Sequence, residues 1–309
     1  MNQPLISICI PAFKRTDFLR IVLNSIVDQE FRDFEVIVTD DSPDDSVKLL
    51  CDTYTARIPL RYHRNATNLG TPENWNEGIR MANGEWIKLM HDDDWFSNKN
   101  ALQQFANIAS STSENVFIFS AYNNMIGPTR QNTVRLSDFR KKALLKDPVS
   151  LLSKNSIGPP SVVMHRNDKN VWYDKNLRWL VDMDFYIRYL QSARAFYIDV
   201  PLVNIGLNEL QVTKQSSLVA AIEIPEHFAI LEKTGVQHLN NVLVFDAWWR
   251  LFRNLKIRTL KDISESGYKG NVPEKLLAII HFQSRFSNRL LHFGPVSKLL
   301  MYNCYLLSK

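Results

Sequence analysis

The chain has 309 residues, 45% hydrophobic and 22% charged, which suits one large globular domain or a domain with an appendage. The first of its 10 glycines is Gly70, which excludes a glycine-rich phosphate loop near the N-terminus, and three separated cysteines without a CxxC pair argue against a zinc site or a disulfide framework. A net charge of +5 without a recognisable binding motif excludes nucleic acid as an expected partner.

The first 125 residues alternate between strand and helix patterns. Residues 5–10 form an apolar run that predicts a buried strand of the mature fold rather than a signal peptide. Helices are predicted to begin near Thr16, Ser42 and Thr71, where a capping residue precedes helically spaced apolar residues. Further strands are predicted at 34–39, 60–64, 85–90 and 116–121. The alternation predicts an α/β fold with a doubly wound, mostly parallel sheet.

The rest of the chain has a weaker pattern. Residues 125–156 are polar and predict a loop with an irregular helix. Strands are predicted at 161–165 and 195–200, with a helix at 182–190 between them. From about residue 216 onward the pattern is helical, interrupted by proline and glycine.

Two acidic clusters directly follow predicted strands. Asp40 and Asp41 follow the strand at 34–39, and Asp92, Asp93 and Asp94 follow the strand at 85–90. Ligands of doubly wound sheets bind beyond the carboxyl ends of the strands, where both clusters are expected. Oxygen ligands of this kind suit Mg²⁺ or Mn²⁺ together with phosphate oxygens. The alternative for the triple carboxylate is a solvated acidic turn; its position after a buried strand favours the metal.

Five motifs occur in order between residues 10 and 188: IPAFKR, TDDSPDD, NLGTPENWNEGI, GEWIKLMHDDDWF and WLVDMDFYIR. Together they give a resemblance to a known family over residues 5 to about 215. In this order and spacing the chain resembles the inverting glycosyltransferases with the GT-A fold, the large family 2-like group that builds bacterial polysaccharides. The resemblance implies a GT-A domain with a nucleotide-sugar-binding half at 1–124 and an acceptor-binding half at 125–215. Residues 216–309 are then a basic helical extension.

The resemblance also implies roles for individual residues. Asp93 matches the acid that coordinates the metal, Mg²⁺ or Mn²⁺, and Asp182 matches the catalytic base. Asp184 lies two residues further on and points away from Asp182 on a helix, so Asp182 alone is preferred as the base. The positions implied to bind the nucleotide-sugar donor are Pro11, Phe13, Arg15, Asp40, Asp41, Asn68, Gly70, Asn76 and Asp92.

Three positions depart from the family's pattern. His91 stands where the first acid of a DxD motif is common, which leaves Asp93 as the main ligand. Val181 replaces the glutamate that usually precedes the base. Asn208 stands where related sequences often carry a histidine near the diphosphate, and an asparagine is a poor metal ligand.

Together these features predict a metal-dependent inverting glycosyltransferase. It would move a sugar from a nucleotide diphosphate sugar to the hydroxyl of a saccharide acceptor, including a lipid-linked one, in the synthesis of O-antigen, capsule or exopolysaccharide. Two alternatives stay open: a non-catalytic nucleotide-sugar-binding subunit, which the three departures keep in view, and a different metal-dependent phosphoryl enzyme. The second alternative needs a basic phosphate cradle or an early nucleophilic DxD, and neither is visible.

The C-terminal tail carries a concentrated positive charge. Residues 250–309 hold eleven Lys or Arg against three acids. Trp248, Trp249, Leu251 and Phe252, interleaved with cations, predict a helix lying on an anionic membrane surface. The alternative is a helical extension packed on the catalytic domain or on a second subunit. The sequence has no run of 18 apolar residues that could span a membrane. The predicted localisation is cytoplasmic. If the tail binds lipid, the protein is expected to bind peripherally to the inner face of the membrane.

Overall fold

The computed structural model describes residues 3–207 and 219–308. The chain forms two compact units. The first, called here the sheet unit, comprises Met1–Lys141, Ser156–Asn176 and Arg188–Glu209. The second, called the helical unit, comprises Lys142–Asn155, Leu177–Ile187 and Leu210–Lys309. Each unit is described separately below.

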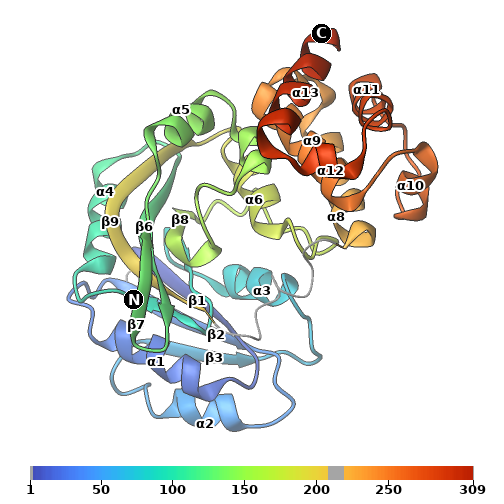
Figure 1. Ribbon diagram of the computed structural model, residues 1–309. Coiled ribbons are helices and arrows are strands. Elements are labelled where there is room, and N and C mark those ends of the chain that lie inside the picture. The colour runs from blue at the N-terminus through green and yellow to red at the C-terminus, as the bar shows by residue number, and fades with distance from the viewer. Residues whose placement is uncertain (1–2, 208–218, 309) are drawn as a thin grey trace. The chain divides into compact units, whose positions relative to one another are not determined.

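One nine-stranded sheet organises the sheet unit (Figure 1). Its first half consists of parallel strands in the order β3-β2-β1-β4. Their bounds are β1 (Ile6–Ala12), β2 (Phe34–Asp40), β3 (Leu60–Arg64) and β4 (Trp86–Leu89). All seven residues of β2 are buried, as expected for a central parallel strand covered on both faces.

The second half of the sheet mixes directions. It continues in the order β8-β6-β9-β5, and β7 pairs with β6 as a hairpin. Only the pairing of β6 with β9 is parallel among the pairings recorded for this half. The bounds are β5 (Asp94–Phe96), β6 (Val116–Ile126), β7 (Thr129–Val134), β8 (Val163–Arg166) and β9 (Arg194–Gly206). The α/β fold class is therefore confirmed, while the loop expected after residue 125 is wrong, because β6 continues to Ile126 and turns through Gly127 and Pro128 into β7.

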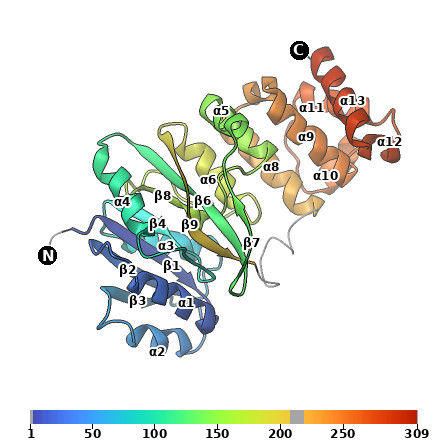
Figure 2. The same cartoon turned by 60° about the vertical axis from the view of Figure 1, so that its left-hand side comes forward.

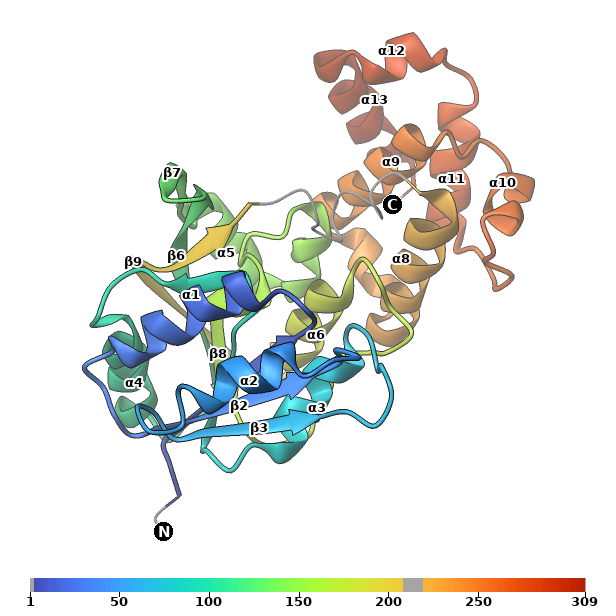
Figure 3. The same ribbon diagram turned by 90° about the horizontal axis from the view of Figure 1, so that it is seen from below.

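Helices cover both faces of the parallel half. Helices α1 and α2 lie against one face and α3 against the opposite face (Figures 1 and 3). This follows from right-handed crossovers: the chain steps outward from β1 to β3 and then returns to β4 on the other side of β1. The bounds are α1 (Thr16–Val27), α2 (Ser46–Asp52), α3 (Glu73–Met81) and α4 (Ala101–Ser111). Gly78 lets α3 approach β1 closely, since a Cβ there would lie 3.3 Å from the Cβ of Cys9.

Helix α9 forms the core of the helical unit, with α11 and α13 packed beside it (Figure 2). The helices of the C-terminal part are α8 (Ala220–Thr234), α9 (Val242–Leu255), α10 (Leu260–Glu265), α11 (Glu274–Gln283), α12 (Asn288–His292) and α13 (Gly294–Leu307). The remaining helices of the described residues are α5 (Asp138–Lys146), α6 (Val181–Tyr189) and the 3₁₀ helices η1 (Pro148–Ser153), η2 (Pro160–Val162) and η3 (Val236–Asn240).

The tryptophan-rich helix is not a membrane-binding surface. Trp248, Trp249, Leu251 and Phe252 are all buried in the helical unit. The indole of Trp249 donates a hydrogen bond to Ser297 Oγ on α13, over 3.1 Å. The prediction that these four side chains lie on a bilayer is therefore wrong, because neighbouring helices of the same unit take up the apolar face instead of lipid. Among residues 3–207 and 219–308, no helix has the length and apolarity needed to cross a membrane.

Candidate functional site

The triple carboxylate begins in the short connection between β4 and β5 and ends at the first residue of β5. Asp92, Asp93 and Asp94 are all buried, so they do not form a solvated turn. Asp94 opens β5 by pairing with Ile205, and its Oδ1 accepts a hydrogen bond from the Gly206 amide over 3.1 Å. A side chain at Gly206 would collide with the Asp93 carbonyl oxygen, so glycine is required where β9 passes the acids. The tertiary fold thus holds three carboxylates away from water.

Arg15 meets two of these acids. It lies at the start of α1, and its guanidinium donates through Nε to Asp92 Oδ2 over 3.1 Å and through Nη1 to Asp93 Oδ2 over 3.0 Å. The third guanidinium nitrogen, Nη2, pairs with Asp92 Oδ1. Burial raises the pKa of Asp92, Arg15 opposes the rise and the neighbouring Asp93 adds to it, so that the pKa lies at about 7. Arg15, Asp92 and Asp93, which the sequence predicts to bind the donor or the metal, thus lie in direct contact.

A metal ion fits a set of donors that includes Asp94. One ligand atom from each of His91, Asp93 and Asp94 lies within 4.8 Å of the others. The His91 ring contacts Trp75, with ring centroids 4.7 Å apart, and its Nε2 is buried without a hydrogen-bond partner among the described residues. Burial lowers the pKa of His91 to about 4, so the imidazole is neutral at pH 7, the form that binds metals. Carboxylates with an imidazole suit Mn²⁺, and an orphaned buried nitrogen is the signal expected of an unfilled ligand position.

Both carboxylate oxygens of Asp41, the residue directly after β2, accept hydrogen bonds from the surrounding loops. Asp41 Oδ1 accepts hydrogen bonds from Asn65 Nδ2 over 2.8 Å and from the Leu69 amide over 3.0 Å. Its Oδ2 accepts from the amide of Gly70 over 2.9 Å. Gly70 has φ +68°, a left-handed conformation that favours glycine. Asp41 therefore fixes the loop that carries Asn68 and Gly70.

Asp40 and Asn76 are buried and hydrogen-bonded inside the sheet unit. Asp40 accepts from the Ser42 amide over 2.8 Å and from the Tyr62 hydroxyl over 2.7 Å. Asn76, on α3, exchanges two hydrogen bonds with the backbone of Tyr173, over 2.9 and 3.1 Å. These contacts give both residues a role in holding the strand ends and the loops near them.

The remaining predicted donor-binding residues lie at or near the ends of β1 and β3. Pro11 belongs to β1, and Phe13 is exposed on the loop that follows it. Lys14 takes φ 63°, and its amide donates to Ser42 Oγ over 2.8 Å. Asn68 is exposed on the loop that Asp41 holds. The loops after β1 and β2 are thus hydrogen-bonded to each other.

Asp182 lies in the first turn of α6, within the helical unit. Its Oδ2 accepts a hydrogen bond from Asn155 Nδ2 over 2.8 Å, and its Oδ1 accepts from the Met183 amide over 2.8 Å. Burial raises the pKa of Asp182 to about 6. A carboxylate that titrates near neutrality suits proton transfer better than an ordinary aspartate does.

Asp184 has a different environment from Asp182, as the sequence predicts for residues two apart on a helix. It is buried and forms an ion pair with Lys233 Nζ over 2.8 Å. Arg188 donates to the Trp172 carbonyl oxygen over 2.7 Å. Asn208 lies outside the described residues.

A family model described as Glycosyl transferase family 2 matches residues 7–171, more than half of the chain. This chain belongs to that family.

Curated relatives of this family 2 protein match part of their length. An uncharacterized glycosyltransferase of Rickettsia typhi, RT0329, is 23% identical over 222 residues, 68% of this chain and 66% of the relative. A GalNAc(5)-diNAcBac-PP-undecaprenol beta-1,3-glucosyltransferase of Campylobacter jejuni is 33% identical over 94 residues, 30% of each protein. The chain thus spans about two thirds of the first relative and under a third of the second.

Solved structures share the fold of this family 2 protein. S. aureus TarS 1–349 in complex with UDP-GlcNAc superposes with a TM-score of 0.67 at 17% identity, covering 98% of this chain and 90% of that one. The mannosyltransferase PcManGT from Pyrobaculum calidifontis, in complex with GDP-Man and Mn²⁺, gives a TM-score of 0.58 at 15% identity, covering 100% and 86%. These likenesses support the GT-A fold and its helical C-terminal region.

Lys88 is a buried cation that the sequence reasoning missed. It is fully buried on β4, where its ammonium donates to the Ser161 carbonyl oxygen and lies 5.1 Å from the centroid of the Phe105 ring. Ser161 Oγ in turn accepts a hydrogen bond from the His91 amide over 2.9 Å. The available signal is a lysine inside the apolar run EWIKLM, where a strand buried on both faces expects an apolar residue. Ser161 thus links the Lys88 ammonium to the His91 backbone amide in the candidate metal cluster.

Replacement of Lys88 by Met is expected to raise the midpoint of thermal unfolding at pH 7. Burial lowers the pKa of Lys88 to about 7, so the folded state binds this proton more weakly than the unfolded state. The cost of burying lysine is fully present below pH 7 and disappears above the ordinary value of 10.5. After loss of the hydrogen bond to Ser161, a net gain on the order of 1 kcal/mol is expected. Melting curves at pH 7 and pH 10.5 test this, and an equal shift at both values contradicts it.

The contact of Arg15 with Asp93 predicts competition with the metal. A guanidinium and a divalent ion both seek the same carboxylate, so Arg15→Gln is expected to bind Mn²⁺ several-fold more tightly in the absence of nucleotide. Electron paramagnetic resonance titration of free Mn²⁺ measures this directly. Arg20→Gln, on the exposed face of α1, is the control and should bind like the unaltered protein. Weaker Mn²⁺ binding by Arg15→Gln would show that Arg15 supports the metal site instead.

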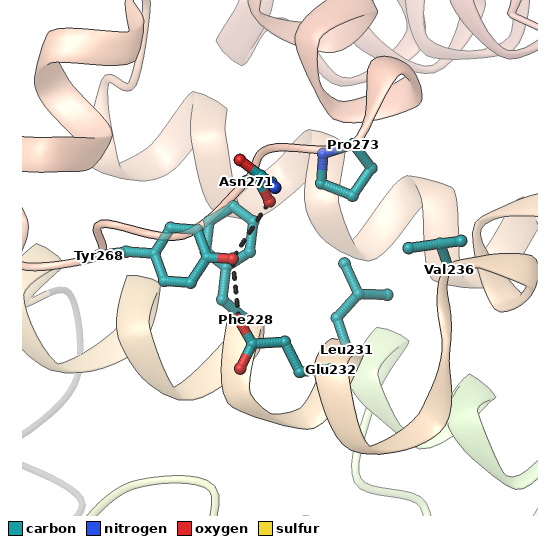
Figure 4. A pocket seen from close by; sticks show the side chains of 7 residues that line it. All are labelled: Phe228, Leu231, Glu232, Val236, Tyr268, Asn271 and Pro273. Atoms are coloured by element: carbon teal, nitrogen blue, oxygen red, sulfur yellow. Dashed lines mark hydrogen bonds between the residues drawn. The ribbon is translucent and has the colours of Figure 1, made fainter.

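The helical unit also contains a shallow hollow of about 250 Å³ (Figure 4). Tyr268 stacks on Phe228 with ring centroids 3.8 Å apart, and its hydroxyl donates to Glu232 Oε1 over 2.9 Å. The hollow is lined by Phe228, Leu231, Glu232, Val236, Tyr268, Asn271 and Pro273. It contains none of the predicted site residues, and its one ring pair is already stacked, so we assign it no chemistry.

Proposed function

We propose that this family 2 protein is a metal-dependent inverting glycosyltransferase that transfers a sugar from a nucleotide diphosphate sugar to a saccharide hydroxyl. The observation that carries the proposal is the buried cluster of His91, Asp93 and Asp94, with Arg15 on Asp93, at the edge where the strands of a GT-A sheet end. A nucleotide diphosphate brings negative charge that a divalent ion and a guanidinium match.

In this proposal Asp93, together with Asp94 and His91, holds Mg²⁺ or Mn²⁺. When bound, the ion supplies electrostatic stabilisation of the departing diphosphate. Arg15 is free to pair with a diphosphate oxygen once its carboxylate partners have another cation. The Mn²⁺ in the complex of PcManGT supports this choice of ion.

The proposed donor pocket uses the loops after β1, β2 and β3. Phe13 and Asn68 are exposed and offer an aromatic face and an amide to the nucleotide. Asp41 and Gly70 hold the loop in place, and Pro11, Asp40 and Asn76 shape the strand ends beneath it. We propose Asp92 as a ribose contact that Arg15 orients. UDP-GlcNAc in the TarS complex and GDP-Man in the PcManGT complex support a nucleotide-sugar donor of either base.

Asp182 is the proposed general base. Its ionised carboxylate takes the proton from the acceptor hydroxyl as that oxygen attacks the anomeric carbon, and in-line attack inverts the anomeric centre. Asn155 and the Met183 amide orient the carboxylate through hydrogen bonds to its two oxygens. Val181, in place of a second acid, leaves Asp182 without a neighbouring carboxylate in the preceding position.

We propose a saccharide acceptor used in cell-surface polysaccharide synthesis at the cytoplasmic face of the membrane. The Campylobacter jejuni relative, a glucosyltransferase named for an undecaprenol-linked saccharide, supports a lipid-linked acceptor. The helices at 216–309 are proposed as an extension outside the transferase domain at 1–215, whose two halves bind donor and acceptor.

A screen of nucleotide diphosphate sugars by thermal shift, with and without Mn²⁺, tests the donor assignment, since a bound ligand raises apparent stability by mass action. Product analysis then decides the reaction: a nucleoside diphosphate supports transfer, whereas inorganic phosphate indicates another phosphoryl enzyme. Tight donor binding without turnover across acceptors would favour the non-catalytic subunit.

A further inference from the structure

An apolar ridge runs along α12 and α13 at the surface of the helical unit. Leu299, Tyr302 and Leu306 recur at spacings of three and four on α13, so they share one helical face, and all three are exposed. The opposite face of α13 packs inward through Met301, Cys304 and Tyr305. Two further exposed apolar residues flank this stripe: Phe293 is 60% exposed and Leu307 is 80% exposed.

The segment of the chain that carries the ridge has a net positive charge. Residues 275–309 contain five Lys or Arg and no Asp or Glu. Arg285 and Arg289 are exposed on the segment leading to the ridge, and Lys298 flanks it on α13. Lys298 pairs with Asp246 over 2.6 Å, which leaves the two arginines as the main source of charge.

A second feature continues the same surface. A shallow hollow of about 200 Å³ lies between α11 and α13, lined by Phe282 and Leu307 together with Arg285 and His281. An apolar hollow bordered by the Arg285 guanidinium suits the junction between a lipid headgroup and its acyl chain. An anionic bilayer offers a negatively charged surface and an apolar interior together, which match the arginines and the exposed apolar side chains.

We propose that the ridge of α12 and α13 binds the surface of an anionic phospholipid bilayer. The apolar stripe enters the boundary between headgroups and acyl chains, and Arg285 and Arg289 pair with lipid phosphates. This surface replaces the buried tryptophan helix α9 as the membrane-binding element. It does not depend on sugar transfer, so it stands or falls separately from the proposed function.

Co-sedimentation with phosphatidylglycerol-containing vesicles tests the proposal, with pure phosphatidylcholine vesicles as the comparison. The full-length protein is expected to partition at least tenfold more strongly to the anionic vesicles, and 1 M salt should remove most of the difference because the Debye length falls to about 3 Å. Equal partition to both vesicle types, or none to either, would overturn the proposal.

Two variants locate the surface. Leu299→Gln/Tyr302→Gln/Leu306→Gln is expected to lower partition at least tenfold, and glutamine keeps the helix propensity high. Arg285→Gln/Arg289→Gln, whose side chains are exposed, should give a similar loss and serves if the triple variant does not fold by circular dichroism. Both should retain the thermal shift with donor sugars.

The matched control lies on α5, where exposed Phe139 and Leu145 also have basic neighbours. Phe139→Gln/Leu145→Gln should bind vesicles like the unaltered protein, and loss of binding here would move the surface to α5. Light scattering tests the remaining alternative, in which the ridge is an interface between two copies of this chain. If the triple variant changes the oligomeric state and leaves vesicle binding intact, the ridge is an interface between copies and the proposal fails.

Discussion

Asp182→Asn is expected to lower kcat for sugar transfer by ~10²–10⁴-fold with little change in donor binding. Asparagine keeps the size of the side chain and its hydrogen bond from the Met183 amide but accepts no proton from the acceptor. Initial rates of nucleoside diphosphate release measure the loss, and the thermal shift with donor checks that the donor still binds.

The stability of this variant separates chemistry from misfolding. Burial raises the pKa of Asp182 from 3.8 to about 6, so protonation favours the folded state. That favourable contribution is complete below pH 3.8 and is lost as the pH rises through about 6. Removal of the charge should therefore leave the melting temperature at pH 7 equal or higher. A variant that is inactive and also melts well below the unaltered protein would not support a base.

The pH profile follows from the same shift. If Asp182 is the base, kcat/KM should fall about tenfold per unit below a pKa of about 6 and level off above it. If kcat/KM falls only near the ordinary aspartate pKa of 3.8, Asp182 is not the general base.

Asp184→Asn is the matched control on the same helix. Asp184 is buried and paired with Lys233, so the neutral amide no longer balances the charge of the Lys233 ammonium. The free energy of unfolding should therefore fall by a few kcal/mol. Transfer per folded molecule should persist, because this side chain is turned away from Asp182. A loss of kcat equal to that of Asp182→Asn would leave the choice between the two acids unsupported.

The second large effect is expected at Asp93. Asp93→Asn should abolish measurable Mn²⁺ binding and reduce transfer by at least ~10²-fold, since a neutral amide replaces the charged ligand that Arg15 also contacts. Electron paramagnetic resonance of Mn²⁺ gives the binding result without reliance on activity.

Asp92→Asn removes one carboxylate beside the site and is the control for the loss of charge in Asp93→Asn. Asp92 pairs with Arg15 but does not belong to the cluster of His91, Asp93 and Asp94, so this variant should keep Mn²⁺ binding. If Asp93→Asn binds Mn²⁺ as tightly as the unaltered protein while Asp92→Asn does not, the ligand assignment must move to Asp92.

Much of the parallel half could be predicted from local pattern. The strands at β1, β2, β3 and β4 follow apolar runs, and α1 and α3 follow apolar residues at helical spacing near Thr16 and Thr71. The short strand β5 and the hairpin partner β7 were not predicted. Strand β5 has only three residues, too few for a periodic pattern, and it begins within the acidic cluster. Strand β7 is mostly exposed and carries no alternating apolar signal.

The sequence alone determined that acids would end two central strands, because a strand buried on both faces must be apolar and can carry charge only where it leaves the sheet. Tertiary structure decided how those acids are used. The contact between Arg15 and Asp92 joins residues 77 positions apart, and no local spacing encodes it. Likewise, the residue pattern of an apolar helix face such as that of α9 is the same whether lipid or protein covers that face. Only the packed fold shows that Trp248 and Trp249 are buried by protein, while Leu299 and Tyr302 on α13 are left at the surface.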